Sequence, residues 1–312
     1  MSLKNDVLDA LQNAEGYISG EELAAKFSKS RAAVWKAIKS LQKDGYKIDA
    51  VTNRGYALCG ESTVINAEEI SRHMKNKIKV LYYPTTDSTN TQAKRLIAQG
   101  DDSVLLVVAS EQTAGRGRQG KTFYSPSTGI YLSLVIHPDT SLQNAVTATT
   151  AAAVAVSRAI EKLTDLKPQI KWVNDVFVNG KKACGILTEA VSDFETGNVS
   201  SVIIGIGVNV MTSDFPDTVE NAGCLGIDIS RAALVAAIAD EMLEIAFSDY
   251  SEFINYYRTH SNILGRKINY IENGVATPAT AIEIDERGGL LVEKENGERL
   301  TLRSGEISIR SV

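Results

Sequence analysis

The residues that could do chemistry are concentrated in one stretch, Gln112 to Ser125. Within it, Gly115 to Lys121 holds three glycines and three cations in seven residues. Glycine can adopt positive φ and has no Cβ, so successive backbone N–H groups can turn toward one anion. Arginine stays protonated, and its planar guanidinium suits a phosphate or carboxylate. The stretch predicts a loop that clasps a polyanionic ligand, with a solvated surface turn as the alternative.

The same loop matches the phosphate-binding pattern G-x-x-x-x-G-K-[ST] from Gly115 to Thr122. A P-loop must open a helix whose N-terminus faces the phosphates. The residues after Thr122 are instead rich in turn formers and lead to a strand-like run, Ile130 to His137. We therefore predict an anion-binding loop between two strands. A P-loop ATPase fused to a DNA-binding domain is the rival that a helix from Lys121 onward would support.

A second polar cluster, Thr85 to Asn90, lies between a strand expected to end at Pro84 and a helix that follows. Such residues often cap a helix. At the end of a strand they can also present hydroxyl and amide groups to a ligand.

A third cluster surrounds Asn179 and Gly180, which are the strongest short signal for a β-hairpin. Lys171, Asp175 and Lys182 lie close to this turn in the sequence, where the simplest interpretation is a surface ion-pair network. Further on, SVIIGIGVNV (201–210) reads as a strand whose two glycines allow something to approach its backbone closely.

The elements before residue 60 predict a winged helix-turn-helix. Ser19 to Glu22 is a capping box, and Ser30 can cap a third helix with an apolar stripe. A hairpin from Tyr46 to Leu58 adds a wing. Between Lys26 and Lys47 the chain has seven cations and one acid, a charge pattern suited to a phosphate backbone. We expect this part to bind DNA, although a solvated lysine face on a three-helix unit is the alternative.

Composition bounds the remaining possibilities. A chain of 312 residues with a net charge of −5 exceeds one typical domain. Its three cysteines, Cys59, Cys184 and Cys224, have no C-x-x-C spacing, which argues against a disulfide framework and a zinc site. No apolar run reaches 18 residues and the N-terminus has no apolar signal region, so we expect a cytoplasmic protein with no membrane partner.

From residue 266, short alternating runs separated by Gly-containing turns predict a small antiparallel barrel.

Together these stretches resemble the biotin protein ligases, specifically the bifunctional kind that also represses biotin-operon transcription. The pieces that match run the length of the chain: Ser88-Thr89-Asn90, Gln112 to Arg118, Lys171 to Asp175 with Lys182, Gly185 to Leu187, Gly205 to Asn209, and the helix at Ser30 with its wing. The resemblance implies a multidomain α+β chain. Its expected parts are a winged helix-turn-helix (1–60), a central α/β biotin/lipoate ligase-like catalytic domain with a mixed sheet (61–265), and an SH3-like β-barrel (266–312).

The resemblance also implies roles for individual residues. The residues expected to bind biotin are Ser88, Thr89, Asn90, Gln112, Arg116, Gly117, Arg118, Lys182 and Gly185. The residues expected to bind ATP and the adenylate are Gly115, Arg116, Arg118, Lys121, Lys182 and Asn209. Arg118, Lys182 and Asp175 are the expected catalytic residues, and Ser30, Arg31, Trp35, Lys36, Lys39 and Arg54 are the expected DNA contacts. The metal ligands are unknown.

The reaction implied by the resemblance has two steps. The biotin carboxylate attacks the α-phosphate of Mg-ATP to give biotinyl-5′-adenylate, and a lysine of a biotin carboxyl carrier protein then takes the biotinyl group. Biotin, ATP and Mg²⁺ are the expected cofactors, while the carrier, operator DNA and a second copy of the chain are the expected partners. Two alternatives stay open: a non-catalytic winged-helix repressor that senses a small molecule, and a lipoate-type ligase on the same fold.

Overall fold

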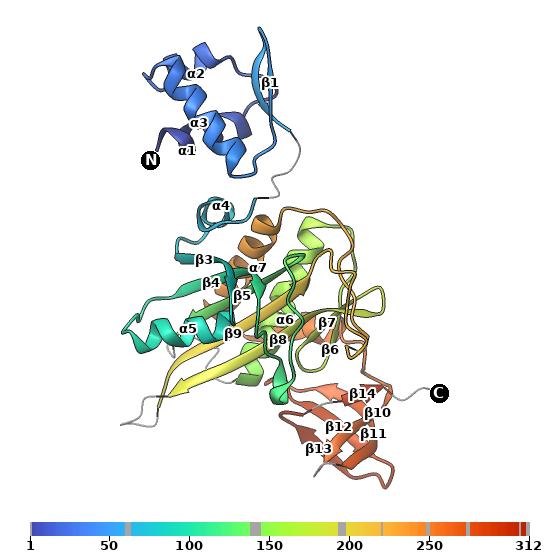
Figure 1. The fold of residues 1–312 in the computed structure, drawn as a ribbon. Coiled ribbons are helices and arrows are strands. Elements are labelled where there is room, and N and C mark those ends of the chain that lie inside the picture. The colour runs from blue at the N-terminus through green and yellow to red at the C-terminus, as the bar shows by residue number, and fades with distance from the viewer. Residues whose placement is uncertain are drawn as a thin grey trace. The chain divides into compact units, whose positions relative to one another are not determined.

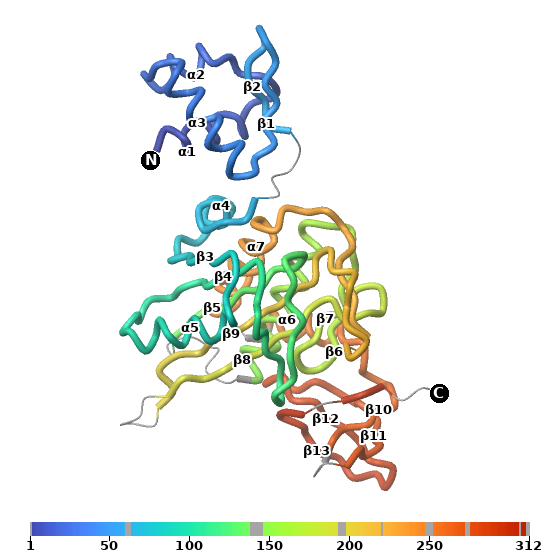
Figure 2. Tube along the Cα trace, viewed as in Figure 1, coloured from blue at the N-terminus to red at the C-terminus, as the bar shows by residue number. Residues whose placement is uncertain are grey.

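A computed structural model of the chain describes residues 2–59, 64–137, 145–192, 198–219, 221–247, 250–272, 275–305 and 307–309. The chain divides into two compact units, which are described separately (Figures 1 and 2). Unit 1 comprises Met1–Ile65 and Ile229–Ala232, and unit 2 comprises Asn66–Asp228 and Ala233–Val312. The expected domain boundaries at residues 60 and 265 stay predictions, and residues 60–63, which follow the first boundary, lie outside the described part.

Unit 1 has three helices and a two-stranded hairpin among its described residues: α1 (Leu3–Gln12), α2 (Gly20–Lys26), α3 (Arg31–Lys43), β1 (Ile48–Val51) and β2 (Gly55–Leu58). The predicted capping box is confirmed. The Ser19 hydroxyl accepts a hydrogen bond from the Glu22 backbone N–H at 3.1 Å, and the Glu22 carboxylate accepts one from the Ser19 N–H at 2.8 Å. Ser30 caps α3 through the backbone N–H of Ala33.

The helices and the wing share one core. Leu8 of α1 and Ile38 and Leu41 of α3 are almost fully buried in it, with Tyr56 of β2 packed against its edge. Tyr56 also exchanges two backbone hydrogen bonds of 2.9 Å with Ile18, which joins the hairpin to the segment before α2. The helix-turn-helix with its wing is therefore as the sequence predicts.

Unit 2 contains a seven-stranded sheet in the order β3-β4-β5-β9-β8-β7-β6. Its strands are β3 (Lys79–Thr86), β4 (Leu105–Gln112), β5 (Gly129–Ile136), β6 (Gln169–Lys171), β7 (Asp175–Val178), β8 (Lys181–Ser192) and β9 (Val199–Asn209). The helices of unit 2 are α4 (Ala67–His73), α5 (Thr89–Ala98), α6 (Ala145–Leu163), α8 (Tyr250–Thr259) and, except for its first two residues, α7 (Arg231–Phe247). Only β3 and β4 pair in parallel among the described strands, so the predicted mixed sheet is confirmed.

Two neighbouring residues of β8 show that helices cover both faces of this sheet. Thr188 bonds to Thr149 of α6 at 2.8 Å, and Glu189 accepts a hydrogen bond from Lys94 of α5 at 2.7 Å. Adjacent residues of a strand point to opposite faces. Helices α5 and α6 therefore lie on opposite faces of the sheet (Figure 1).

The strand that we expected to end at Pro84 continues to Thr86. Proline cannot donate a ladder hydrogen bond, but β3 is an edge strand, where that loss is tolerated. The extension carries the polar cluster at 85–90 up beside Gln112 at the end of β4, since Thr86 pairs with Gln112.

The C-terminal part of unit 2 forms a five-stranded antiparallel sheet in the order β13-β12-β11-β10-β14. Its strands are β10 (Lys267–Glu272), β11 (Val275–Ile284), β12 (Leu290–Lys294), β13 (Arg299–Leu302) and β14 (Ile307–Ile309). Among the described residues β13 and β14 form opposite edges and do not pair, so closure into an SH3-like barrel is not confirmed. The indole N–H of Trp172 donates to the Gly288 carbonyl at 2.8 Å and ties this sheet to the larger one.

No helix in the described ranges is both long and apolar enough to cross a membrane.

Gly55 gives a test of how the wing is held. It has φ +103°, and a Cβ at this position would overlap the backbone of Ile18. Gly55→Ala should destabilise unit 1 by more than about 3 kcal/mol, because backbone strain and a steric clash coincide. Gly16→Ala is the matched control, since its Cβ would meet open space. Hydrogen exchange of the unit 1 amides would measure both, and equal protection in the two variants would contradict the interpretation.

Candidate functional site

A pocket of about 730 Å³ opens on the α5 face of the seven-stranded sheet in unit 2. Twelve of the residues that the sequence singled out for ligase chemistry line it: Ser88, Thr89, Asn90, Gln112, Arg116, Gly117, Arg118, Lys121, Asp175, Lys182, Gly185 and Asn209. The structure thus brings together segments that are up to 121 residues apart in the chain. Their individual roles stay predictions.

Gly115 is the expected ligand residue that does not line the pocket. A Cβ on Gly115 would lie 2.5 Å from the carbonyl oxygen of Phe123 and 2.5 Å from the Ser125 hydroxyl. Its carbonyl accepts a hydrogen bond from the Phe123 N–H at 2.9 Å. Gly115 therefore allows the two ends of the cationic loop to close against each other.

The cationic loop folds back on itself without opening a helix. Gly117 N–H donates to the Lys121 carbonyl at 2.7 Å, and Arg118–Gly120 is a short 3₁₀ turn. Gln119 and Gly120 both have positive φ, and the next regular element after Lys121 is the strand β5. The P-loop rival required a helix from Lys121 onward, so the structure contradicts it.

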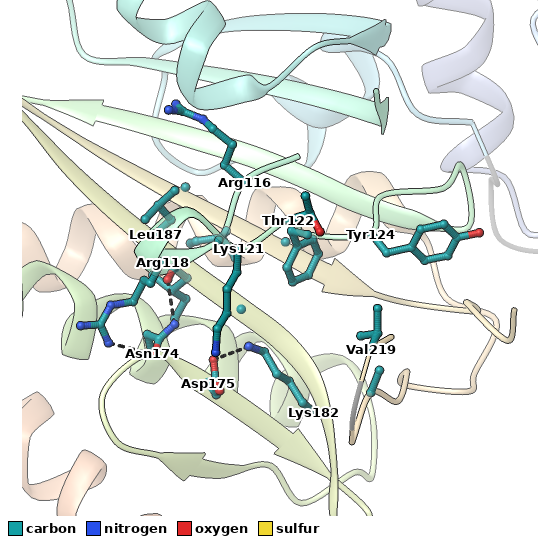
Figure 3. Close-up of a pocket in the computed structure, with 18 of the residues that line it drawn as sticks. Arg116, Arg118, Lys121, Thr122, Tyr124, Asn174, Asp175, Lys182, Leu187 and Val219 are labelled. Carbon is teal, nitrogen blue, oxygen red and sulfur yellow. Dashed lines mark hydrogen bonds and ion pairs between the residues drawn. The ribbon is translucent and has the colours of Figure 1, made fainter. Parts of the chain in front are cut away.

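The cations at the pocket contact oxygen atoms from other segments of the chain. Arg116 Nη2 lies 3.1 Å from Glu189 Oε2, and Lys182 Nζ lies 2.7 Å from Asp175 Oδ1. Arg118 Nη1 donates to the Asn174 side chain and to the Gly305 carbonyl, each at 3.2 Å. Figure 3 shows that the Lys121 side chain also points toward Asp175. All four cations therefore line the cavity, and oxygens of the protein bind Arg116, Arg118 and Lys182.

Buried polar groups form the floor of the pocket. Ser88, Thr89 and Asn90 are each less than 5 % exposed. Ser88 occupies the position before α5 but makes no side-chain cap, so simple helix capping does not explain the cluster. Gln112 accepts a hydrogen bond from the Thr89 N–H at 2.8 Å, and Asn90 Oδ1 accepts one from Ser133 at 2.6 Å. This network fixes the amide groups that face the cavity.

The glycines of β8 and β9 make room for this floor. A Cβ on Gly205 would overlap the Asn90 amide, and a Cβ on Gly207 would lie 2.6 Å from the Phe123 ring. Gly185 faces the same ring at 2.8 Å. The close approach that the sequence predicted for the two β9 glycines is confirmed, and the approaching groups belong to the protein itself.

Asn209 at the end of β9 is 4 % exposed, and its Nδ2 donates to the Gly223 carbonyl at 2.9 Å. Its Oδ1 is buried and has no hydrogen-bond partner among the described residues. A buried acceptor that lines a cavity suits a ligand N–H or O–H donor.

Sequence reasoning missed several residues that build the site. Ser133 lies in a run that the sequence predicted as a strand, and Glu189 lies in β8 just beyond the predicted hairpin, but neither was given a role. Asn174 lies within a matched motif without a role assigned to it. Gly305, Ile307 and Ser308 line the pocket from the C-terminal sheet, and the sequence carries no sign of this long-range contact.

The environment of two groups affects their ionisation. Burial alone would raise the pKa of Glu189, but hydrogen bonds from Lys94 and Asn90 and the charge of Arg116 outweigh it and lower that pKa. The carboxylate therefore stays charged at neutral pH. Complete burial raises the pKa of the Cys184 thiol, which excludes a thiolate nucleophile at this position near neutral pH.

In unit 1, the residues expected to contact DNA are exposed: Ser30, Arg31, Trp35, Lys36, Lys39 and Arg54. Trp35 is 52 % exposed on α3, which is unusual for a large aromatic side chain. The Arg54 guanidinium lies over the Tyr17 ring at 4.2 Å, so the wing presents a fixed cation.

Comparison with known proteins agrees with this architecture. Residues 82–209 match the biotin/lipoate A/B protein ligase family, residues 4–57 match a family of HTH domains, and residues 263–310 match the biotin protein ligase C-terminal domain. The fold and the site thus define a ligase-type enzyme with an added DNA-binding domain.

Two of the relatives cover nearly the whole chain. The bifunctional ligase/repressor BirA of Bacillus subtilis is 32 % identical over 320 residues, covering 95 % of each chain, and that of Escherichia coli is 29 % identical, covering 96 % of this chain and 95 % of its own. The biotin protein ligase of Aquifex aeolicus, solved with biotin and ATP, superposes with a TM-score of 0.63 at 26 % identity, over 75 % of this chain and 99 % of its own. The chain belongs to the family of bifunctional biotin ligase/repressors.

Steric contact between Gly205 and Asn90 can be tested by mutation. Gly205→Ala should destabilise unit 2 by about 1–3 kcal/mol, because the added methyl group forces the Asn90 side chain out of its network. In an Asn90→Ala background the same substitution should cost much less, since the clashing amide is gone. Chemical unfolding of the four variants measures both effects, and strictly additive losses would contradict the contact.

Proposed function

We propose that this protein is an ATP-dependent biotin protein ligase that forms biotinyl-5′-adenylate and transfers biotin to a lysine of a biotin carboxyl carrier protein. We propose further that it is a biotin-responsive repressor that binds operator DNA. The observation that carries the first proposal is the gathering of Arg116, Arg118, Lys121 and Lys182 around one pocket with a buried polar floor. Its relatives named as bifunctional ligase/repressors support both proposals.

The first chemical step brings two anions together, the biotin carboxylate and the triphosphate of ATP. Their repulsion raises the barrier unless fixed positive charge offsets it in a site that excludes water. Arg118 and Lys182 come from different segments, so together they can hold the two reactants in line. The amide groups of Asn90 and Gln112, which line the pocket, suit the uncharged polar ureido group of biotin better than the apolar dithiolane of lipoate. This favours biotin over the lipoate alternative.

A sensor without catalysis is the remaining rival. Such a protein needs only to bind its effector, and nothing in that task requires a lysine and a carboxylate 2.7 Å apart beside the cationic loop. Release of pyrophosphate when biotin and ATP are supplied would exclude this rival.

Mg²⁺ enters the proposal together with ATP. It usually binds through substrate phosphates, water and one or two carboxylates, so a dedicated protein cage is not needed. The Asp175 carboxylate lines the pocket and can supply such a ligand. Among the described residues, no group of three or more His, Cys, Asp or Glu could hold a metal ion by itself.

The repressor proposal depends on linkage between the two units. Adenylate binding would order the loops around 111–128 and 211–229 and favour a homodimer. Two winged helices could then bind a two-fold operator, because DNA half-sites mirror the symmetry of the protein that reads them. The exposed cations of α3 and the fixed Arg54 of the wing support DNA as the partner.

Arg118→Ala and Lys182→Ala should each slow adenylate formation by about 3 to 4 kcal/mol in the transition state, because each removes a charge that offsets the developing negative charge. Biotin-dependent exchange between ATP and pyrophosphate measures this step. Arg299→Ala is a matched control, since Arg299 pairs with Glu293 away from the pocket. Unchanged exchange in both pocket variants would refute the proposed roles.

The second step requires a neutral lysine, although the pKa of a free lysine is about 10.4. We expect Asp175 to orient the acceptor amine or to take its proton. Asp175→Ala should therefore slow biotin transfer from preformed adenylate by about 10²-fold or more. Single-turnover transfer to a carrier domain is the measurement, and near-normal transfer would reject the role.

Operator affinity should rise when biotin and ATP are both present, because the adenylate favours the dimer that the operator selects. Fluorescence anisotropy with a duplex selected by the protein from a random library, combined with sedimentation, measures both effects. Lys36→Ala should still dimerise but bind DNA more weakly, with a salt slope reduced by about 1. Affinity that does not respond to biotin plus ATP would contradict the linkage.

A further inference from the structure

Glu189 of β8 carries a partly buried carboxylate, and the proposed reaction gives it no role. Its Oε1 accepts a hydrogen bond from Lys94 Nζ at 2.7 Å. Its Oε2 accepts hydrogen bonds from Asn90 Nδ2 at 2.8 Å and from Arg116 Nη2 at 3.1 Å. One side chain thus joins helix α5, strand β8 and the cationic loop.

The partner in the loop is also a pocket residue. Arg116 lines the cavity, yet Figure 3 shows its guanidinium directed away from Asp175 and Lys182. An arginine already paired with a carboxylate must leave that partner before it can bind the anionic group of a ligand in the same geometry. Glu189 therefore competes with an anionic ligand for Arg116.

We propose that Glu189 is a positioning residue that holds Arg116 as its counter-ion in the free protein and releases it to the carboxylate or phosphate of the ligand. The ligand is taken to be biotin and its adenylate, so the inference rests on the proposed function. Glu189 lowers the affinity for the ligand and leaves the chemical step unaffected once the ligand is bound.

Lys94 makes the exchange feasible. When Arg116 leaves, Glu189 keeps an ion pair with Lys94, so its charge is never left without a cation nearby. Lys94 does not line the pocket, and its side chain is 40 % exposed. It therefore stabilises Glu189 in both states without contacting the ligand itself.

The size of the effect follows from exposure. The Arg116 and Glu189 side chains are 42 % and 20 % exposed, so solvent screens their attraction. Partly exposed ion pairs of this kind change an equilibrium by about two- to fivefold. The competition should tune ligand affinity within that range.

Glu189→Gln is the decisive variant, because its amide oxygen can still accept the hydrogen bond from Asn90 while the charge that holds Arg116 is lost. Titration calorimetry with biotin should show a dissociation constant about two- to fivefold lower than that of the wild type. In ATP–pyrophosphate exchange, KM for biotin should fall by a similar factor and kcat should stay the same. A purely structural role would weaken binding or lower kcat.

Two further variants isolate the mechanism. In an Arg116→Ala background, Glu189→Gln should no longer tighten biotin binding, because Glu189 and the ligand then have no shared arginine to compete for. If Glu189 instead weakened binding only by repelling an anionic ligand, the gain in affinity would persist in this background. Lys94→Met should weaken biotin binding, because Arg116 then becomes the main cation for Glu189. This opposite shift keeps the inference testable if Glu189→Gln does not fold.

The outcomes separate this inference from the function on which it rests. A wild-type protein that binds no biotin overturns the proposed function and this inference with it. If the wild type binds biotin, then unchanged or weaker binding in Glu189→Gln overturns the inference alone. A gain that persists without Arg116 does the same.

Discussion

The pocket of unit 2 depends on how the protein offsets the repulsion among the cations that line one cavity. Arg116, Arg118, Lys121 and Lys182 all line it, and like charges this close are costly unless anions or dipoles compensate them. Protein oxygens supply this compensation through two carboxylates, one amide and one backbone carbonyl. An anionic ligand that binds these cations would therefore have to replace the carboxylates of Glu189 and Asp175.

The sheet makes this arrangement rigid. Gly185, Gly205 and Gly207 lie on the same face of β8 and β9, where the missing side chains admit the Asn90 amide and the Phe123 ring. Groups from α5 and from the cationic loop thereby approach the strands more closely than side chains would normally permit. A polar floor is built against an apolar sheet, and its hydrogen bonds are protected from water.

Local patterns predicted the elements well and the site in part. The capping box at Ser19, the Asn179–Gly180 turn and the absence of a helix after Lys121 are local chemistry, and the structure has all three. The continuation of β3 beyond Pro84 depended on its edge position in the sheet, which no local pattern reveals. Glu189 and the residues from the C-terminal sheet were missed because their roles arise from contacts between segments far apart in the chain.

The participation of the C-terminal sheet has a practical consequence for handling the protein. Gly305, Ile307 and Ser308 form part of the pocket wall, and Arg118 donates to the Gly305 carbonyl. A bulky label on Ile307 or Ser308 would therefore crowd the cavity, so it is better attached to an exposed turn that does not line the pocket, such as Asn296–Gly297 between β12 and β13.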